Sequence, residues 1–90
     1  MTMDDSRANP LDRVRVVLVA PSHPGNVGAS ARAMLAMGLS RLALINPLQF
    51  PAAAATARAS GADDILTNAT VHTTLAEAIA PEFTYFVVYG

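Results

Sequence analysis

The chain contains no cysteine, and this absence limits the cross-links and metal sites that it can form. Disulfide bonds and thiolate ligands are excluded. The two histidines, His23 and His72, are too few and too far apart in the sequence to suggest a zinc site. We therefore expect no metal-binding site.

Long apolar runs are also lacking. No stretch approaches the roughly 20 residues that a membrane-spanning helix requires, and the N-terminus has no continuous apolar segment of the kind found in signal peptides. The sequence therefore predicts a cytoplasmic protein with no membrane association.

Charge is scarce, since 14% of the 90 residues are charged and the formal net charge is -1. This balance argues against a free-standing nucleic-acid binder held by bulk electrostatics. All basic residues are nevertheless arginines, the type preferred for bidentate phosphate contacts. Except for Arg32, each of them taken singly is most simply explained as a solvated surface residue. The six are Arg7, Arg13, Arg15, Arg32, Arg41 and Arg58.

The most informative stretch runs from Val14 to Gly38. Its first part, Val14 to Val19, is a nearly unbroken β-branched run, which is typical of a strand buried on both faces in a parallel sheet. The loop Pro21 to Asn26 then lies at the carboxyl end of that strand, where open α/β sheets bind ligands. We expect Asn26 to cap a helix that begins at Val27 and ends at a Gly38 C-cap.

This loop and helix suggest a phosphate site. The first amides of a helix lack intrahelical partners, and Gly25 and Gly28 allow another molecule to approach the backbone. In this hypothesis Gly25 adopts a backbone angle that other residues avoid, and Arg32, one turn beyond Gly28, reaches back toward the loop. The alternative is that both glycines serve strand–helix packing and Arg32 extends into solvent. A lone GxxG does not decide between them, and GxGxxG is absent.

The rest of the chain alternates helices and strands after a polar segment, 1–12, that is predicted to be a flexible leader. We expect a second strand at 42–45, a helix over 51–60 ended by Gly61, a turn capped by Asp63-Asp64, a strand at 70–73, a helix over 75–80 opened by a Thr74–Glu77 capping box and closed by Pro81, and a last strand at 83–88. The adjacent acids suit the helix dipole better than a metal or an acid–base pair. The pattern predicts an α/β fold with flanking helices and a mainly parallel sheet of about four strands.

The segment PSHPGNVGASARAMLAMGLSRLALINP, at 21–47, resembles motif 1 and its flanks in the SpoU/TrmH-type RNA 2'-O-ribose methyltransferases of the SPOUT superfamily. Within that family it is most similar to the TrmJ branch, which acts on tRNA. The features that carry the resemblance are Asn26 and Arg32 at the family's separation, the Gly-Leu-Ser-Arg-Leu step at 38–42 and the Ala-Ser-Gly-Ala-Asp-Asp run at 59–64. The resemblance extends from about residue 13 to about residue 80, roughly the first half of a catalytic domain.

The resemblance implies that residues 13–90 are the N-terminal half of a SPOUT (α/β knot) domain with the knot missing. S-adenosylmethionine would be held by motifs 2 and 3, which lie beyond Gly90, so no cofactor-binding residue is expected within this chain. The activity implied is 2'-O-methylation of tRNA or rRNA by a homodimer whose site forms between two protomers. The 90 residues alone are expected to be inactive and to bind the cofactor weakly or not at all.

The same resemblance assigns site residues. Arg32 and Asn26 would be catalytic, and the RNA or phosphate contacts would be made by Gly25, Asn26, Gly28 and Arg32. A guanidinium with a pKa above about 12 is a poor general base. We therefore expect Arg32 to hold a phosphate and stabilise developing alkoxide charge, with Asn26 positioning it.

Two other functions remain open. An RNA- or phosphate-binding α/β half-domain without catalysis explains the loop and Arg32 equally well. A nucleotide-using enzyme of Rossmann type is disfavoured because Asn46-Pro47, and not an acidic residue, follows the second strand.

The final strand lacks the neighbours that the family provides, so its aromatic faces are expected to be exposed. Such exposure favours poor solubility or association with another chain.

Overall fold

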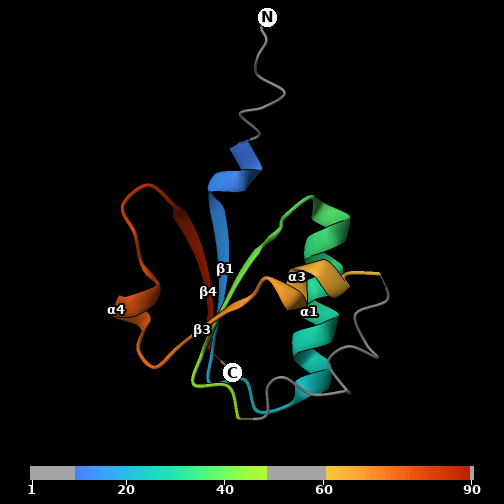
Figure 1. The fold of residues 1–90 in the computed structure, drawn as a ribbon, viewed down its shortest axis with the longest axis horizontal. Helices are drawn as coiled ribbons and strands as arrows, with labels where there is room; N and C mark the ends of the chain where they lie inside the picture. Colours follow the sequence, from blue (N-terminus) through green and yellow to red (C-terminus); the bar gives the residue numbers. More distant parts are fainter. Residues whose placement is uncertain (1–9, 49–60, 90) are drawn as a thin grey trace, which may run out of the picture.

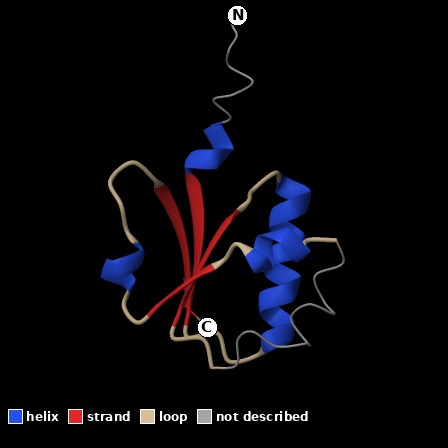
Figure 2. Ribbon diagram, in the orientation of Figure 1, coloured by secondary structure: helices blue, strands red, loops and turns tan. Residues whose placement is uncertain are grey.

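A computed structural model describes residues 10–48 and 61–89 of the chain. Helices and strands alternate along it, and the strands form one sheet between helices (Figures 1 and 2). The predicted α/β fold is thereby confirmed. In chain order the elements are η2 Pro10–Arg13, β1 Val14–Val19, α1 Pro24–Met37, β2 Arg41–Ile45, α3 Asp63–Thr67, β3 Thr70–His72, α4 Leu75–Ala78 and β4 Thr84–Tyr89.

The sheet has four strands in the order β3-β2-β1-β4, and every pairing is parallel. The central strand β1 is bonded to β2 on one side and to β4 on the other. Figure 1 shows α1 and α3 on one side of the sheet and α4 on the other. All carboxyl ends of the strands therefore lie at the same edge, below the sheet in this view.

Apolar side chains are buried on both faces of the sheet, as the unbroken apolar runs of β1 and β2 predict. On the face covered by α1 and α3, strand residues such as Val16 and Leu44 belong to one cluster with Val27 and Met34 of α1. On the other face a smaller cluster is made by Val17, Ala43, Ile45 and Ala78. The helix α1 is therefore fixed against the sheet by its own apolar stripe.

The start of α1 differs from the prediction. The helix begins at Pro24, not at Val27, and His23 is its N-cap without a side-chain capping bond. Asn26 therefore does not cap the helix, and Gly25 lies inside it in a right-handed conformation. The physical reason is Pro24, because proline has the φ angle of a first helical residue and lacks only an N–H that would be unpaired there.

The end of α1 is as predicted. Gly38 adopts φ 80°, ψ 16°, and its N–H donates to the carbonyl of Leu35 at 3.1 Å. The N–H of Leu39 donates to the carbonyl of Met34 at 2.8 Å. The left-handed glycine thus satisfies the last carbonyls of the helix and turns the chain into β2.

Gly38→Ala is expected to lower the free energy of unfolding by about 1–2 kcal/mol, the cost of a left-handed conformation for a residue with a Cβ. The new Cβ would also lie 3.1 Å from Leu11 Cδ1. Gly61→Ala is a matched control, because Gly61 has φ 92° but its added Cβ would meet no atom within 4 Å. Urea denaturation should show the larger loss for Gly38→Ala, and equal losses would contradict a role for the Leu11 contact.

Several later elements also differ from the predicted bounds. Asp63 and Asp64 lie in the first turn of α3, whose N-cap is Ala62, so neither carboxylate caps the helix. The helix α4 ends at Ala78, two residues before the predicted end, and Ile79 is its C-cap in an extended conformation. The predicted helix over 51–60 and the leader up to residue 9 lie outside the described residues.

The N-terminus of α4 carries a modified capping box. Thr74 is the N-cap, and its hydroxyl accepts from the N–H of Glu77 at 3.3 Å. The Glu77 carboxylate accepts from the N–H of Thr73 at 3.0 Å and from the hydroxyl of Thr73 at 2.9 Å. The N-cap amide of Thr74 acts on the same carboxylate more weakly. These bonds to Thr73 hold the pKa of Glu77 below its ordinary value of 4.5.

Glu77 is therefore expected to make stability pH-dependent in acid. Its pKa is lower in the folded than in the unfolded chain, so its contribution is present above pH 4.5 and is lost as the pH falls through the folded pKa. Glu77→Gln should flatten the dependence of stability on pH in that window, as measured by urea denaturation. Glu82→Gln is the control, since Glu82 is exposed and its carboxylate accepts no hydrogen bond from the described part of the chain. Parallel pH profiles for Glu77→Gln and the parent chain would contradict the assignment.

Strand β4 leaves one edge of the sheet open in the part of the chain that the structure describes. Several of its side chains are largely exposed. On the face toward α1, Phe86 is 64% and Val88 is 50% exposed, and Tyr89, which points to the opposite face, is 72% exposed. The predicted exposure of aromatic side chains is found for Phe86 and Tyr89, whereas Phe83 and Tyr85 are half-buried. Association through this edge stays a prediction, based on the tendency of unpaired apolar edges to take up another strand.

Candidate functional site

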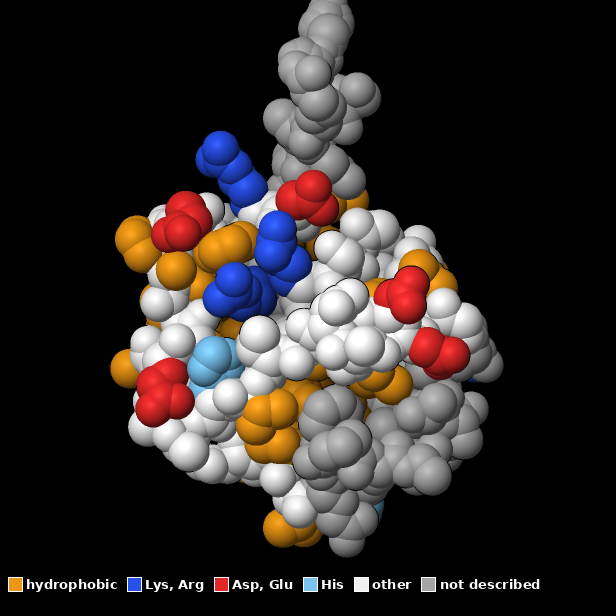
Figure 3. All heavy atoms as spheres, viewed as in Figure 1, with side chains coloured by type: hydrophobic (Ala, Val, Ile, Leu, Met, Phe, Trp, Pro, Cys, Tyr) orange, Lys and Arg blue, Asp and Glu red, His pale blue; other side chains and the backbone are white. Residues whose placement is uncertain are grey.

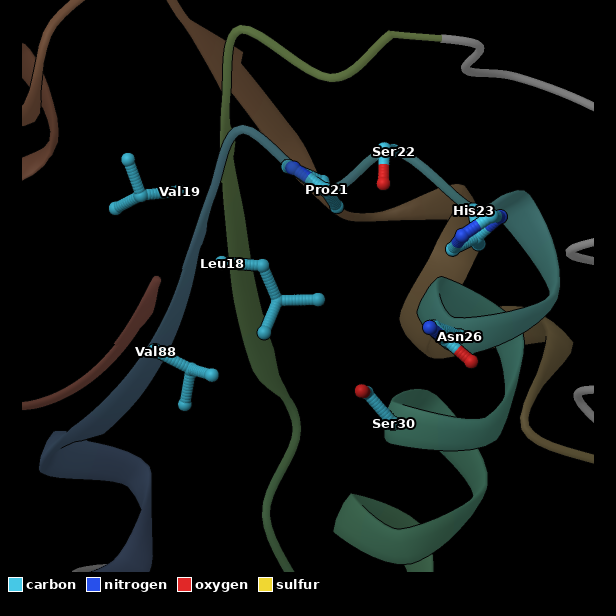
Figure 4. A pocket seen from close by; sticks show the side chains of 8 residues that line it. All are labelled: Leu18, Val19, Pro21, Ser22, His23, Asn26, Ser30 and Val88. Carbon is cyan, nitrogen blue, oxygen red and sulfur yellow. The ribbon is translucent and has the colours of Figure 1, made fainter. Parts of the chain in front are cut away.

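A hollow of about 170 Å³ lies at the carboxyl end of β1, where the topology predicts a ligand site. Leu18 and Val88 form its apolar side, and polar side chains from the β1–α1 loop and from α1 face them (Figure 4). Ligand pockets are usually about 300–1,000 Å³, so the described residues form only part of a site for a molecule of cofactor size. The hollow is lined by Leu18, Val19, Pro21, Ser22, His23, Asn26, Ser30 and Val88.

The loop that frames the hollow is held in an unusual backbone conformation. Ala20 adopts φ 54°, and its N–H donates to the carbonyl of Ile45 at 2.7 Å. A left-handed conformation costs an alanine about 1–2 kcal/mol. The N–H of Leu48 further donates to the carbonyl of Pro21 at 3.1 Å. These bonds bind the loop after β1 to the end of β2 and the residues that follow it.

Asn46 likewise links the end of β2 to the end of β3 by hydrogen bonds. It adopts φ 48°, its N–H donates to the carbonyl of His72 at 2.9 Å, and its side-chain Nδ2 donates to the carbonyl of Thr73 at 2.9 Å. From the sequence, Asn46 is predicted only to follow the second strand. Asparagine tolerates the left-handed region, so that signal was present for Asn46, whereas nothing in the sequence marks Ala20.

The early start of α1 changes the donors available at its N-terminus. Pro24 has no N–H, and the N–H of Asn26 donates to the carbonyl of His23 at 3.0 Å. Fewer free amides remain than the sequence predicted for anion binding. The side chains supply other polar groups, because Asn26 and Ser30, one turn apart, both lie along the hollow (Figure 4). Sequence reasoning missed Ser22 and Ser30, although the spacing of Ser30 from Asn26 indicates a shared helix face.

The phosphate-site hypothesis predicts that Gly25 and Gly28 leave the backbone open to a ligand, and the structure places these glycines differently. Gly28 is buried and Gly25 is half-buried, and both lie within α1. Neither lines the hollow. Their burial agrees with the alternative in which both glycines serve strand–helix packing, because small residues let a helix approach its neighbours closely.

Arg32 is exposed and does not line the hollow. At about 100° per residue, its side chain leaves α1 roughly 160° away from that of Ser30. It forms no hydrogen bond or ion pair with any residue that the structure describes. The predicted convergence of Asn26 and Arg32 on one loop is therefore not found within the described chain, and the guanidinium remains available to a ligand or to another chain.

Among the described residues that line the hollow there are hydroxyl, imidazole and amide groups but no carboxylate. Such groups suit hydrogen bonding to a polar ligand and provide no acid–base pair of acidic residues. No group of metal-ligating side chains occurs within residues 10–48 and 61–89. Over the same ranges, no helix has the length and apolarity needed to cross a membrane.

Comparison with known proteins identifies relatives over most of the chain. The family model described as SpoU rRNA Methylase family matches residues 13–87. A tRNA (cytidine/uridine/adenosine-2'-O-)-methyltransferase TrmJ of Pseudomonas aeruginosa is 61% identical over 70 residues, which are 78% of this chain and 27% of that protein. The chain thus spans about a quarter of the length of this curated relative.

Solved structures give the same result at the level of the fold. A probable methyltransferase from Bordetella pertussis has a TM-score of 0.75 at 49% identity, covering 79% of this chain and 44% of its own. TrmJ from Z. mobilis ZM4 has a TM-score of 0.71 at 45% identity, covering 73% of this chain and 30% of its own. With a family model matched over most of its residues, the chain belongs to the SpoU rRNA Methylase family.

Proposed function

We propose that the chain is the motif 1 part of an S-adenosylmethionine-dependent RNA 2'-O-methyltransferase that acts on tRNA. The observation that carries the proposal is the 61% identity over 70 residues to a tRNA 2'-O-methyltransferase. The parallel sheet, with a hollow at the carboxyl end of β1, supports it. A tRNA substrate is favoured over rRNA because that relative is a tRNA methyltransferase. The cytoplasm is the expected place of action because tRNA is found there.

Within this proposal Arg32 and Asn26 act on the RNA. Arg32 holds the phosphate next to the target ribose and stabilises the charge that develops on its 2'-oxygen, and Asn26 positions the strand. Contacts to RNA are assigned to Gly25, Asn26, Gly28 and Arg32. The burial of Gly28 restricts its part to letting the helix sit close to its neighbours.

The surroundings of Arg32 are compatible with a site shared between two protomers. Its guanidinium has no partner within the described chain, and it does not line the hollow that Asn26 lines. A homodimer brings a second chain to this exposed side of α1 and allows the two residues to serve different halves of one site. This arrangement explains why a single chain does not bring them together.

The described residues do not fit S-adenosylmethionine by themselves. The hollow of about 170 Å³ is well below the size of a cofactor pocket. We therefore expect isothermal calorimetry to detect no micromolar binding of S-adenosylmethionine to the 90-residue chain. Micromolar binding would contradict the proposal that these 90 residues lack the cofactor site.

A chimeric enzyme tests the function directly. The matching 70-residue segment of the P. aeruginosa TrmJ is replaced by that of this chain, and transfer of a labelled methyl group to tRNA is measured. We expect activity within about tenfold of the unaltered enzyme, because the two segments are 61% identical. A folded chimera that binds tRNA in a salt-dependent way but transfers no methyl group would contradict the proposal and favour the RNA-binding half-domain.

A further inference from the structure

The sheet carries two arginines side by side at the end opposite the hollow. Arg15 of β1 and Arg41 of β2 are register partners, and both stack on one aromatic ring. The Cζ atom of Arg15 lies 4.0 Å from the centroid of the Phe83 ring, and that of Arg41 lies 5.3 Å from it. Figure 3 shows arginine side chains gathered at this end of the sheet. We call Arg15, Arg41 and Phe83 the arginine patch.

Most of the hydrogen-bond donors in the patch are unused. Arg15 donates from Nη1 to the carbonyl of Ala78 at 3.0 Å, and Arg41 donates from Nε to the carbonyl of Asp12 at 2.8 Å. Each guanidinium has five N–H donors. Asp12 and Glu82 lie next to Arg13 and Phe83 in the sequence. In the described part of the chain, however, no carboxylate forms an ion pair with Arg15 or Arg41.

Two like charges held on one ring without a counter-ion repel each other. The ring fixes the planes of both guanidinium groups by cation–π contact, which limits the entropy lost when they bind a ligand. An anion placed between them removes the repulsion and accepts the free donors. The patch is therefore preorganised for an anionic ligand.

A second hollow, of about 290 Å³, opens beside the patch. Besides the two arginines it presents the polar residues Ser40, Asn68 and Thr70, and these three and Arg41 are exposed. Hydroxyl and amide groups beside a planar guanidinium can donate hydrogen bonds to the oxygens of a phosphate. Because the rim is exposed, the hollow suits a phosphate within a polymer that passes over the surface.

We infer that the arginine patch binds phosphate groups of an RNA strand, as a contact separate from motif 1. This inference rests on the proposed function for the choice of RNA. The patch faces the α4 side of the sheet, since Arg15 bonds to Ala78, whereas the first hollow lies between β1 and α1. It therefore attaches the substrate at a distance from the reacting ribose.

The test uses the 90-residue chain and a single-stranded RNA oligonucleotide, with affinity measured over a range of salt concentrations. Arg41→Gln should weaken binding and reduce the slope of log affinity against log salt by about 1, the effect of losing one phosphate contact. Arg13→Gln is the charge-matched control, because Arg13 is exposed and does not line the hollow. Thermal melting of each variant checks that the fold is retained.

NMR spectra recorded with the oligonucleotide locate the contact. We expect the largest amide shifts at Ser40, Arg41, Asn68 and Thr70. Shifts confined to 24–32, or equal salt slopes for Arg41→Gln and Arg13→Gln, would overturn the inference. So would a response to inorganic phosphate without RNA binding, or equal affinity for polyglutamate.

Methyl transfer by the chimera separates this inference from the proposed function. An active chimera whose tRNA affinity is insensitive to Arg41→Gln contradicts the patch and leaves the function standing. An inactive chimera, combined with RNA binding that depends on Arg41, supports the patch and contradicts the function.

Discussion

Arg32→Ala in the chimeric enzyme is expected to reduce methyl transfer by at least 100-fold. Removing one donor that stabilises transition-state charge typically costs 10²–10³ in rate, and Arg32 would also lose its hold on the adjacent phosphate. Arg32→Lys keeps the positive charge but not the planar fork, so we expect part of the activity to remain. The rate constant under single-turnover conditions is the measurement, because it isolates the transfer step from product release.

Arg13→Ala is the matched control for this series, since Arg13 is an exposed arginine outside α1. Unchanged turnover in Arg32→Ala would contradict the catalytic assignment of this residue. Loss of all turnover in Arg32→Lys with intact tRNA binding would count against charge stabilisation and in favour of a role that only a guanidinium can perform.

Leu44→Ala is expected to destabilise the fold by about 2–5 kcal/mol, the range measured for deleting buried leucine side chains. Leu44 has no exposed surface and lies in β2, beneath the face covered by α1 and α3. Small domains are stable by only about 5–15 kcal/mol, so this substitution removes a large part of the total. Urea denaturation followed by circular dichroism measures the change.

Leu48→Ala is the control, because Leu48 is 71% exposed and loses the same atoms without leaving a cavity. We expect its stability to stay within about 0.5 kcal/mol of the parent. Equal destabilisation by the two substitutions would show that Leu44 does not lie in a packed core.

The sequence by itself determined the elements whose signals are local. The β-branched run predicts β1, the glycine at position 38 predicts the end of α1, and Thr74 with Glu77 predicts the start of α4. Each depends on backbone preferences within a few residues. The family resemblance likewise came from a continuous stretch around motif 1, which the family model confirms over residues 13–87.

Only the tertiary structure decided how distant residues combine. The sequence could not place β4 beside β1, so it could not bring Phe83 under Arg15 and Arg41. It also predicted that Asn26 and Arg32 would converge, whereas α1 begins at Pro24 and only Asn26 of the two lines the hollow. Strand order and the direction of a side chain follow from packing across the sheet, and no short stretch of sequence contains that information.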